Sequence, residues 1–221
     1  MANEVKKLNT IAIASIKNVN GITDANLKKL NGQEFTGYTA LTWATGNAIA
    51  TARDGHTQHG TATDGMITAG YNGSASLVTT EEFDGTNWGV VTGGNLSFSD
   101  GSGGTFGLGT EGAGVNSGGY SSDEEDRTEE YGGSSWSTGG DLAVAMYGAA
   151  SWGTAAAGVC VGGTLFGPTQ RDRQTTQEYT SSTWENVNAC STGTSQSACF
   201  GTLSAGIKAT GASGGSSATD T

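Results

Sequence analysis

The stretch TEEFDGTNW, residues 80–88, decides the fold. It carries the turn pair Asp84-Gly85 and an aromatic residue five positions before a tryptophan, so it predicts a β-hairpin. The pattern recurs with variations as TGYTALTW, TEEYGGSSW and TQEYTSSTW, at residues 36–43, 128–136 and 176–184. The tryptophans that end these four copies, Trp43, Trp88, Trp136 and Trp184, lie 45, 48 and 48 residues apart. A period of this length indicates a solenoid, a propeller or another repeat array.

A second pattern, G-T-x-x-x-G-x-x-x-x-G, occurs once in each repeat, and its four copies begin at Gly60, Gly109, Gly153 and Gly201. One strand before the G-T, one after it and the two strands of the aromatic hairpin make about four strands per repeat. Four strands in a unit of about 40–50 residues are typical of a propeller blade, so the sequence predicts an all-β fold. The second glycine of each copy is expected in a crowded place near the propeller axis: Gly65, Gly114, Gly158 and Gly206.

The repeats resemble those of kelch proteins, in which a strand ends on two glycines and an aromatic residue and a tryptophan follow. Gly118-Gly119 and Gly162-Gly163 match the kelch double glycine, whereas Gly70 and Gly211 keep one glycine of the two. The resemblance covers residues 38–221 and implies a kelch-like β-propeller. It says almost nothing about function.

Both ends of the repeat region fall inside a repeat, because the chain enters at an aromatic–Trp hairpin and ends where the next one would begin. We therefore expect one domain, 36–221, with about four blades in a ring closed by its N- and C-terminal strands. Residues 38–47 would then lie antiparallel beside 195–211, and no sheet edge would stay exposed. A part of a longer array is the alternative.

Residues 1–35 form a separate arm with a period of 11, seen in VKKLNT, IKNVNG and LKKLNG. Asn-Gly after a short amphipathic run, as in the second and third copies, is a helix stop signal and predicts two or three one-turn helices joined by irregular links. Such turns are too short to bury their apolar residues among themselves, so these are the candidate assembly residues: Ile11, Ile13, Ile16, Val19, Ile22, Leu27 and Leu30. The arm resembles N-terminal anchoring segments of tail-fibre and other virion proteins of bacteriophages, marine ones especially. Packing on its own propeller is the alternative.

Charge and composition narrow the function classes. Residues 1–37 carry +2, and the remaining residues carry five basic and 18 acidic side chains, or −13, which opposes binding to nucleic acid. No stretch is apolar enough to span a membrane, and IAIASI near the N-terminus is too short for a secretory signal. The three cysteines fit small buried residues in a reducing compartment.

Candidate chemistry is sparse. His56 and His59 are interpreted as loop histidines, with no metal and no cofactor expected. Two variable loops are the candidate outer binding residues, and their opposite charges suggest ion pairs between blades: Asp123, Glu124, Glu125, Asp126, Arg171 and Arg173. The repeated tryptophans are expected to pack blade against blade. Some kelch proteins are copper oxidases, but two histidines in one segment do not fit that chemistry, so no enzyme is expected.

These observations favour a non-enzymatic virion protein, a tail fibre, spike or capsid-associated component made in the host cytoplasm. Its arm would dock on other virion proteins, and its propeller loops would face a host glycan, a host protein or neighbouring subunits, homo-oligomers included. A free-standing carbohydrate- or protein-binding module of bacterial origin is the alternative.

Overall fold

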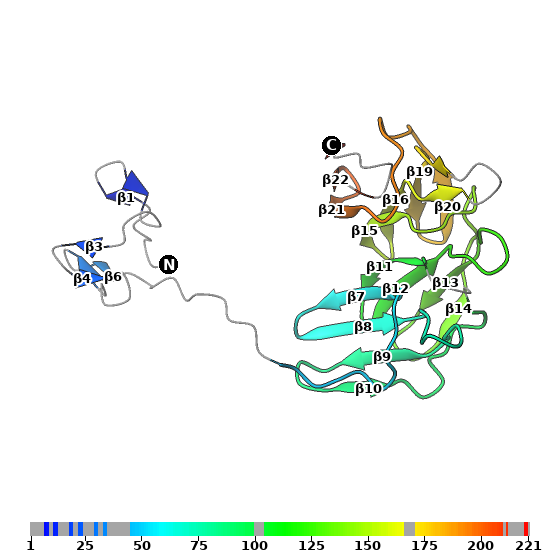
Figure 1. Cartoon of the computed structure of the whole chain (residues 1–221), viewed down its shortest axis with the longest axis horizontal. Coiled ribbons are helices and arrows are strands. Elements are labelled where there is room, and N and C mark those ends of the chain that lie inside the picture. The colour runs from blue at the N-terminus through cyan, green and yellow to red at the C-terminus, as the bar shows by residue number, and fades with distance from the viewer. Residues whose placement is uncertain are drawn as a thin grey trace. The chain divides into compact units, whose positions relative to one another are not determined.

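The chain divides into two compact units in the computed structural model, Met1–Thr45 and Gly46–Thr221. The structure describes residues 7–8, 11–12, 18–19, 22–23, 29–30, 33–34, 45–99, 104–165, 171–209, 211 and 219–220. Within these ranges every regular element is a β-strand, which confirms the all-β class for the described part of the chain (Figure 1). None of the described residues belongs to a helix long and apolar enough to cross a membrane.

The larger unit contains four antiparallel sheets that follow one another along the chain (Figure 1). Sheet 1 consists of β7 (Thr57–Thr61), β8 (Asp64–Thr68), β9 (Thr80–Phe83) and β10 (Trp88–Val90). Sheet 2 consists of β11 (Phe106–Thr110), β12 (Ala113–Ser117), β13 (Thr128–Tyr131) and β14 (Trp136–Thr138).

The last two sheets repeat this order with small changes. Sheet 3 consists of β15 (Ala150–Thr154), β16 (Ala157–Val161), β19 (Thr176–Thr180) and β20 (Thr183–Asn186). A small hairpin of β17 (Thr164–Leu165) and β18 (Arg171–Asp172) extends from it. The described strands of sheet 4 are β21 (Ala198–Thr202), β22 (Ala205–Ala209) and β23 (Thr219–Asp220). The predicted four-stranded repeat is thus confirmed three times, in a propeller-like arrangement.

The turn chemistry of residues 80–88 explains the outer hairpin. The Asp84 carboxylate accepts hydrogen bonds from the backbone N–H groups of Thr86 and Asn87, at 2.8 and 2.7 Å, and so closes the turn. Phe83 and Trp88 are then direct cross-strand partners, with ring centroids 5.1 Å apart. Five-residue spacing of the two aromatic residues is what this turn length requires, as the sequence predicted.

The inner hairpin of each sheet is formed by the G-T-x-x-x-G pattern, whose two glycines pair across the hairpin. Gly60 pairs with Gly65 in sheet 1, and the other three sheets repeat this register. Gly60 has φ +89°, and a Cβ there would lie 2.1 Å from the Asp64 carbonyl oxygen. Only glycine fits such a position.

Successive sheets pack through their inner strands, because β7 contacts β11, β11 contacts β15, and β15 contacts β21. At each of these interfaces a large side chain lies over the second glycine of the following sheet. A Cβ on Gly158 would lie 2.3 Å from Leu108 Cδ1, and one on Gly206 would lie 2.2 Å from Trp152. The predicted crowding is therefore confirmed for Gly114, Gly158 and Gly206, where its cause is the preceding sheet, whereas the three atoms nearest to a Cβ on Gly65 belong to sheet 1 itself.

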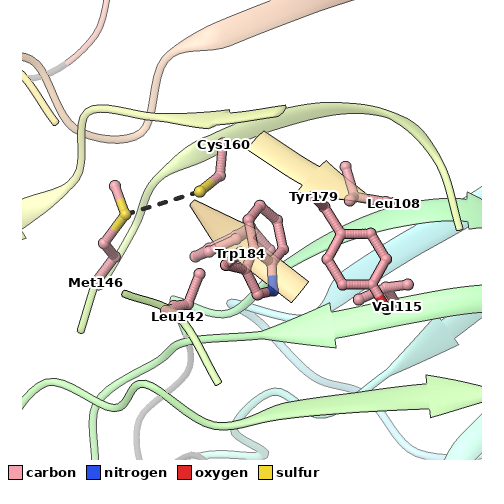
Figure 2. Packing of buried hydrophobic residues seen from close by; sticks show 8 residues of the cluster. Leu108, Val115, Leu142, Met146, Cys160, Tyr179 and Trp184 are labelled. Carbon is pink, nitrogen blue, oxygen red and sulfur yellow. Dashed lines mark hydrogen bonds between the residues drawn. The ribbon is translucent and has the colours of Figure 1, made fainter. Parts of the chain in front are cut away.

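The main apolar core lies between sheets 2 and 3 and is small. Figure 2 shows it, including the contact of 3.7 Å between Cys160 Sγ and Met146 Sδ. It contains Phe106, Leu108, Val115, Leu142, Met146, Cys160, Tyr179 and Trp184. The low apolar content of the sequence is accommodated because glycines let the sheets approach closely and hydrogen bonds join them.

The expected ring closure is not present among the described residues. The side chain of Asn47 donates to the Thr86 carbonyl oxygen at 3.1 Å and to Asn87 Oδ1 at 2.6 Å, so residue 47 lies at sheet 1 and not beside 195–211. The strand that pairs with β22 is β23, from the C-terminal end of the chain. Residues 38–44 lie outside the described residues.

The smaller unit contradicts the predicted helical turns, because its described residues form three short hairpins spaced 11 residues apart. They are β1 (Lys7–Leu8) with β2 (Ile11–Ala12), β3 (Asn18–Val19) with β4 (Ile22–Thr23), and β5 (Lys29–Leu30) with β6 (Gln33–Glu34).

The physical reason for this error lies in the Asn-Gly pairs. Two residues separate the paired Val19 and Ile22, and they are Asn-Gly, the dipeptide that most favours a two-residue hairpin. Their interpretation as helix ends was wrong. The predicted boundary after residue 35 lies outside the described residues.

Candidate functional site

Hydrogen bonds from the aromatic hairpins join sheets 2 and 3 each to the preceding sheet. The Tyr131 hydroxyl donates to Glu82 Oε1 at 2.6 Å, and Trp136 Nε1 donates to Thr80 Oγ1 at 2.9 Å. Sheet 3 repeats both contacts on sheet 2: Tyr179 to Glu130 at 2.5 Å and Trp184 to Thr128 at 3.1 Å. The expectation that repeated tryptophans join blades is confirmed for Trp136 and Trp184.

The second residue of each TEE or TQE segment is buried and holds the chain that enters its sheet. Glu81 forms a fully buried ion pair with Arg53, with Nη2 and Oε1 2.6 Å apart, and accepts the backbone N–H of Ala50. Glu129 accepts the backbone N–H of Ser97, and Gln177 bonds both backbone groups of Val144. These recurring polar groups therefore hold the fold together.

A pocket of about 620 Å³ is the candidate ligand site of sheets 1 to 3. Its lining includes His56, Gln58, His59, Met66, Trp88, Leu108 and Trp152. Two histidines and two tryptophans in one concave site are an arrangement suited to a small polar molecule with an apolar face.

His59 supplies the polar centre of this pocket. It lies in β7 with its side chain buried, so the expectation of a loop histidine is wrong for it. Its Nδ1 lies 2.9 Å from the Leu108 carbonyl oxygen, which can only accept, so Nδ1 carries the hydrogen and Nε2 is left as an acceptor. Nε2 has no partner within the described structure.

Burial lowers the pKa of His59 to about 4, against a smaller opposing effect of the bond to Leu108. Burial and the nearby Arg53 charge also lower the pKa of His56. Both rings are therefore neutral near pH 7. Among the residues that the structure describes, no group of three or more metal-ligating side chains is found.

A larger groove of about 930 Å³ lies at sheets 3 and 4 and was not foreseen from the sequence. Its lining includes Trp152, Thr176, Glu178, Val187, Phe200, Leu203, Ile207 and Lys208. Thr176 and Glu178 occupy the register positions at which sheets 1 and 2 accept their tryptophan and tyrosine hydrogen bonds.

The inner part of this groove holds an unexpected buried lysine. Lys208 is 2% exposed, and its Nζ donates to the Thr192 carbonyl oxygen at 2.5 Å and to Cys190 Sγ at 3.4 Å. All three cysteines are free, but only Cys160 is fully buried, so the expectation of buried thiols is correct for one of them. Burial raises the pKa of the Cys160 thiol, which keeps it protonated and unreactive.

The predicted acidic loop is held by its own side chains. Glu125 forms an ion pair with Arg127 at 2.8 Å, and Arg127 also covers the Phe98 ring at 4.1 Å. Asp123 Oδ1 accepts the backbone N–H of Glu124, whereas Asp126 is exposed. The partner of this loop is therefore Arg127, which sequence reasoning passed over although it stands two residues away.

Arg171 and Arg173 lie at the small hairpin of sheet 3. Arg171 pairs with Leu165 in the register of β17 and β18. Arg173 donates its backbone N–H to the Gly163 carbonyl oxygen at 2.8 Å, and its buried Nε has no partner among the described atoms. No ion pair between Arg173 and the loop acids is found in the described part of the chain, so the structure does not bring these predicted residues together.

The candidate assembly residues of the arm are placed in part. Ile11, Val19, Ile22 and Leu30 lie on the described strands β2, β3, β4 and β5. Ile13, Ile16 and Leu27 lie outside the described residues.

Comparison with known proteins shows a shared fold without a shared sequence. No family model matches the chain, and no curated protein matches its sequence. In contrast, 127 chains of solved structures match it, so the fold alone does not select a function. The structure titled "Structure of YjhT" superposes with a TM-score of 0.64 at 11% identity, over 79% of this chain and 66% of that one. The chain thus spans about two thirds of that protein's length, and the likeness concerns the fold.

Proposed function

We propose that the protein is a non-enzymatic component of a bacteriophage particle, in which the hairpin arm docks on other virion proteins and a kelch-like propeller carries the outer contacts. The observation that supports this most directly is the division of the chain. Three hairpins of identical spacing form a unit apart from the acidic body, and two-stranded hairpins are marginal in water without a surface to cover them.

The roles of the acidic residues support the same proposal. Glu82 and Glu130 accept tyrosine hydroxyls, and Glu81 and Glu129 hold the incoming chain. These repeated carboxylates are thus engaged in joining sheets and not arranged as a catalytic pair. A body of −13 also disfavours nucleic acid as the partner.

Deletion of residues 1–35 tests the docking role of the arm. We expect the remaining chain to keep its melting temperature and to be absent from purified particles. Deletion of residues 18–28 removes one 11-residue repeat and leaves the other two in register, so it should weaken incorporation without abolishing it. Normal incorporation of the protein lacking 1–35 would refute the proposal.

The pocket around His59 favours a second candidate, a carbohydrate-binding module. Tryptophan rings and polar side chains in one concave pocket suit a sugar, whose apolar face stacks on an indole. Titration of the protein with a panel of neutral glycans tests this candidate. Binding that is lost in Trp88→Ala and in His59→Phe would support it.

A further inference from the structure

Sheets 1 and 4 stand at the two ends of the series of packed sheets, so each has one face that no other described sheet covers. At every internal interface a side chain of one sheet lies over a glycine of the next: His59 near Gly114, Leu108 on Gly158 and Trp152 on Gly206. Phe200 occupies the same register position in sheet 4 and is 61% exposed. At the other end, the three atoms nearest to a Cβ on Gly65 all belong to sheet 1 itself.

The exposed large hydrophobic side chains of the described structure gather at these two faces. Phe200, Leu203 and Val187, which are 61%, 38% and 38% exposed, line the groove at sheets 3 and 4. Val90, which is 53% exposed, lies on β10 two positions after Trp88, so it shares the outer face of sheet 1 with that tryptophan. Scattered hydrophobic residues are ordinary, but apolar clusters at both ends of a series of stacked sheets indicate contact surfaces.

The groove also lacks the donors that occupy the equivalent places between the other sheets. Within the described residues, no hydrogen bond reaches the Thr176 hydroxyl or the Glu178 carboxylate. Their counterparts Thr128 and Glu130 bind Trp184 Nε1 and the Tyr179 hydroxyl. The groove therefore fits an indole N–H and a phenol hydroxyl carried five residues apart on a hairpin.

The sequence contains two further pairs with this spacing, Tyr147/Trp152 and Tyr38/Trp43. Trp152 lies on the inner strand β15 and its Nε1 already donates to the Thr202 carbonyl oxygen, so Tyr38 and Trp43 are the remaining candidates.

We propose that a second copy of this chain docks head to tail on sheet 4. Its sheet 1 covers Phe200 and continues the series of stacked sheets. Its Tyr38 and Trp43 enter the groove and donate to Glu178 and Thr176. The contact thus repeats the three internal interfaces and joins two different faces, so successive copies form either a ring or an open filament.

Reach favours a second copy over the chain's own Tyr38 and Trp43. Asn47 is bound to the outer turn of sheet 1, and the four residues from Trp43 to Asn47 span at most about 14 Å. Sheets 2 and 3 stand between sheets 1 and 4 (Figure 1). Packed sheets lie about 10 Å apart, so Thr176 and Glu178 on sheet 3 are about 20 Å from sheet 1, and sheet 4 is about 30 Å from it.

The body is acidic, and both faces carry charged side chains beside their exposed apolar ones. Glu178 and Lys208 line the groove, and the surface around Val90 and Trp88 includes Asp64, Glu82, Asp84 and Glu111. Repulsion between bodies of −13 opposes association, and salt screens it. Association should therefore strengthen as the salt concentration rises.

Two exposed substitutions, each blocking one face, test the proposal. The full-length protein is expected to form dimers and larger species in sedimentation velocity as its concentration rises. Phe200→Asp and Val90→Asp should each weaken self-association more than about tenfold, because each places an unpaired carboxylate in the contact. A mixture of the two variants should form a dimer and nothing larger, since each retains the face that the other has lost. Ser135→Asp, on an exposed turn of sheet 2, is the matched control and should associate like the unchanged chain.

A second substitution tests the groove, since Trp43→Ala should behave like Val90→Asp and be complemented by Phe200→Asp in the same way. A monomer at every concentration, or a mixture that stays monomeric, would overturn the proposal and would favour closure within one chain. These experiments use purified protein alone, so their failure leaves the test of particle incorporation unaffected.

Discussion

The Tyr131 hydroxyl lies 2.6 Å from Glu82 Oε1, so a phenol of sheet 2 is bound to a carboxylate of sheet 1. Burial, and then the bond to Glu82 itself, raise the pKa of Tyr131, so the phenol stays protonated and keeps donating. Tyr179 and Glu130 repeat this relationship one sheet later. A polar bond between sheets thus substitutes for part of the apolar core that the sequence lacks.

Tyr131→Phe should lower the free energy of unfolding by about 1–2 kcal/mol, because the carboxylate of Glu82 loses its donor. Chemical denaturation with urea measures the change. Phe83→Tyr is the matched control, because sheet 1 has no preceding sheet among the described residues, and its stability should stay within about 0.5 kcal/mol. Equal stability of Tyr131→Phe and the unchanged protein would mean that the bond contributes nothing.

Gly158→Val should destabilise the protein by about 1–3 kcal/mol, because its Cβ would lie 2.3 Å from a buried Leu108 methyl group. Thermal unfolding followed by circular dichroism measures the effect. Gly89→Val is the control, since nothing lies within 4 Å of a Cβ at that strand position. A melting temperature that falls equally in both variants would attribute the loss to strand propensity instead of crowding.

Glu81→Gln and Glu129→Gln should differ although they occupy the same register position. Glu81→Gln leaves the buried Arg53 charge without its partner and should cost about 3–5 kcal/mol. Glu129 accepts hydrogen bonds from Ser97, and an amide already serves at the equivalent Gln177, so Glu129→Gln should cost less than about 1 kcal/mol. Similar urea midpoints for the two variants would contradict the assigned role of the ion pair.

His59 should make stability depend on pH between about 6.5 and 4. Its pKa in the folded protein is about 4, below that of an unfolded histidine, so the unfolded state binds more protons in this window. Stability contributed by the neutral ring is fully present above pH 6.5 and is lost as the pH falls towards 4, by about 3 kcal/mol in total. Urea midpoints at pH 7 and pH 5 should therefore differ less in His59→Gln than in the unchanged protein. An unchanged difference would show that other groups cause it.

Sequence reasoning succeeded where one short segment determines its own structure. Asp84 closes the outer turn with bonds inside residues 84–87, so the hairpin and its period were readable before any contact was known. The paired glycines of the inner hairpins were readable for the same reason.

Sequence reasoning failed where the structure depends on residues far away in the chain, and where one dipeptide is compatible with two different local structures. The burial of His59 depends on Leu108, 49 residues away, and Lys208 is buried through Thr192 and Cys190. Asn-Gly fits the end of a helix as well as a hairpin turn, and only the pairing of Val19 with Ile22 distinguishes them. A segment of two residues on either side carries too little apolar pattern to decide.

The direction of the bonds between sheets implies a gradient of local opening along the chain. The hairpin residues Tyr131, Trp136, Tyr179 and Trp184 hold sheets 2 and 3 to the preceding sheet, whereas the described strands of sheet 4 carry no such pair. Sheet 4 is instead joined to sheet 3 by Trp152 Nε1, which donates to the Thr202 carbonyl oxygen at 3.0 Å. Most residues of β21 are exposed, in contrast to β11 and β15. Amide hydrogens of β21 and β22 should therefore exchange with deuterium before those of the other inner strands, and unravelling of the propeller-like unit should begin at this end. Any partner that covers Phe200 would slow that exchange first, so the exchange rate of sheet 4 would report the protein's own assembly.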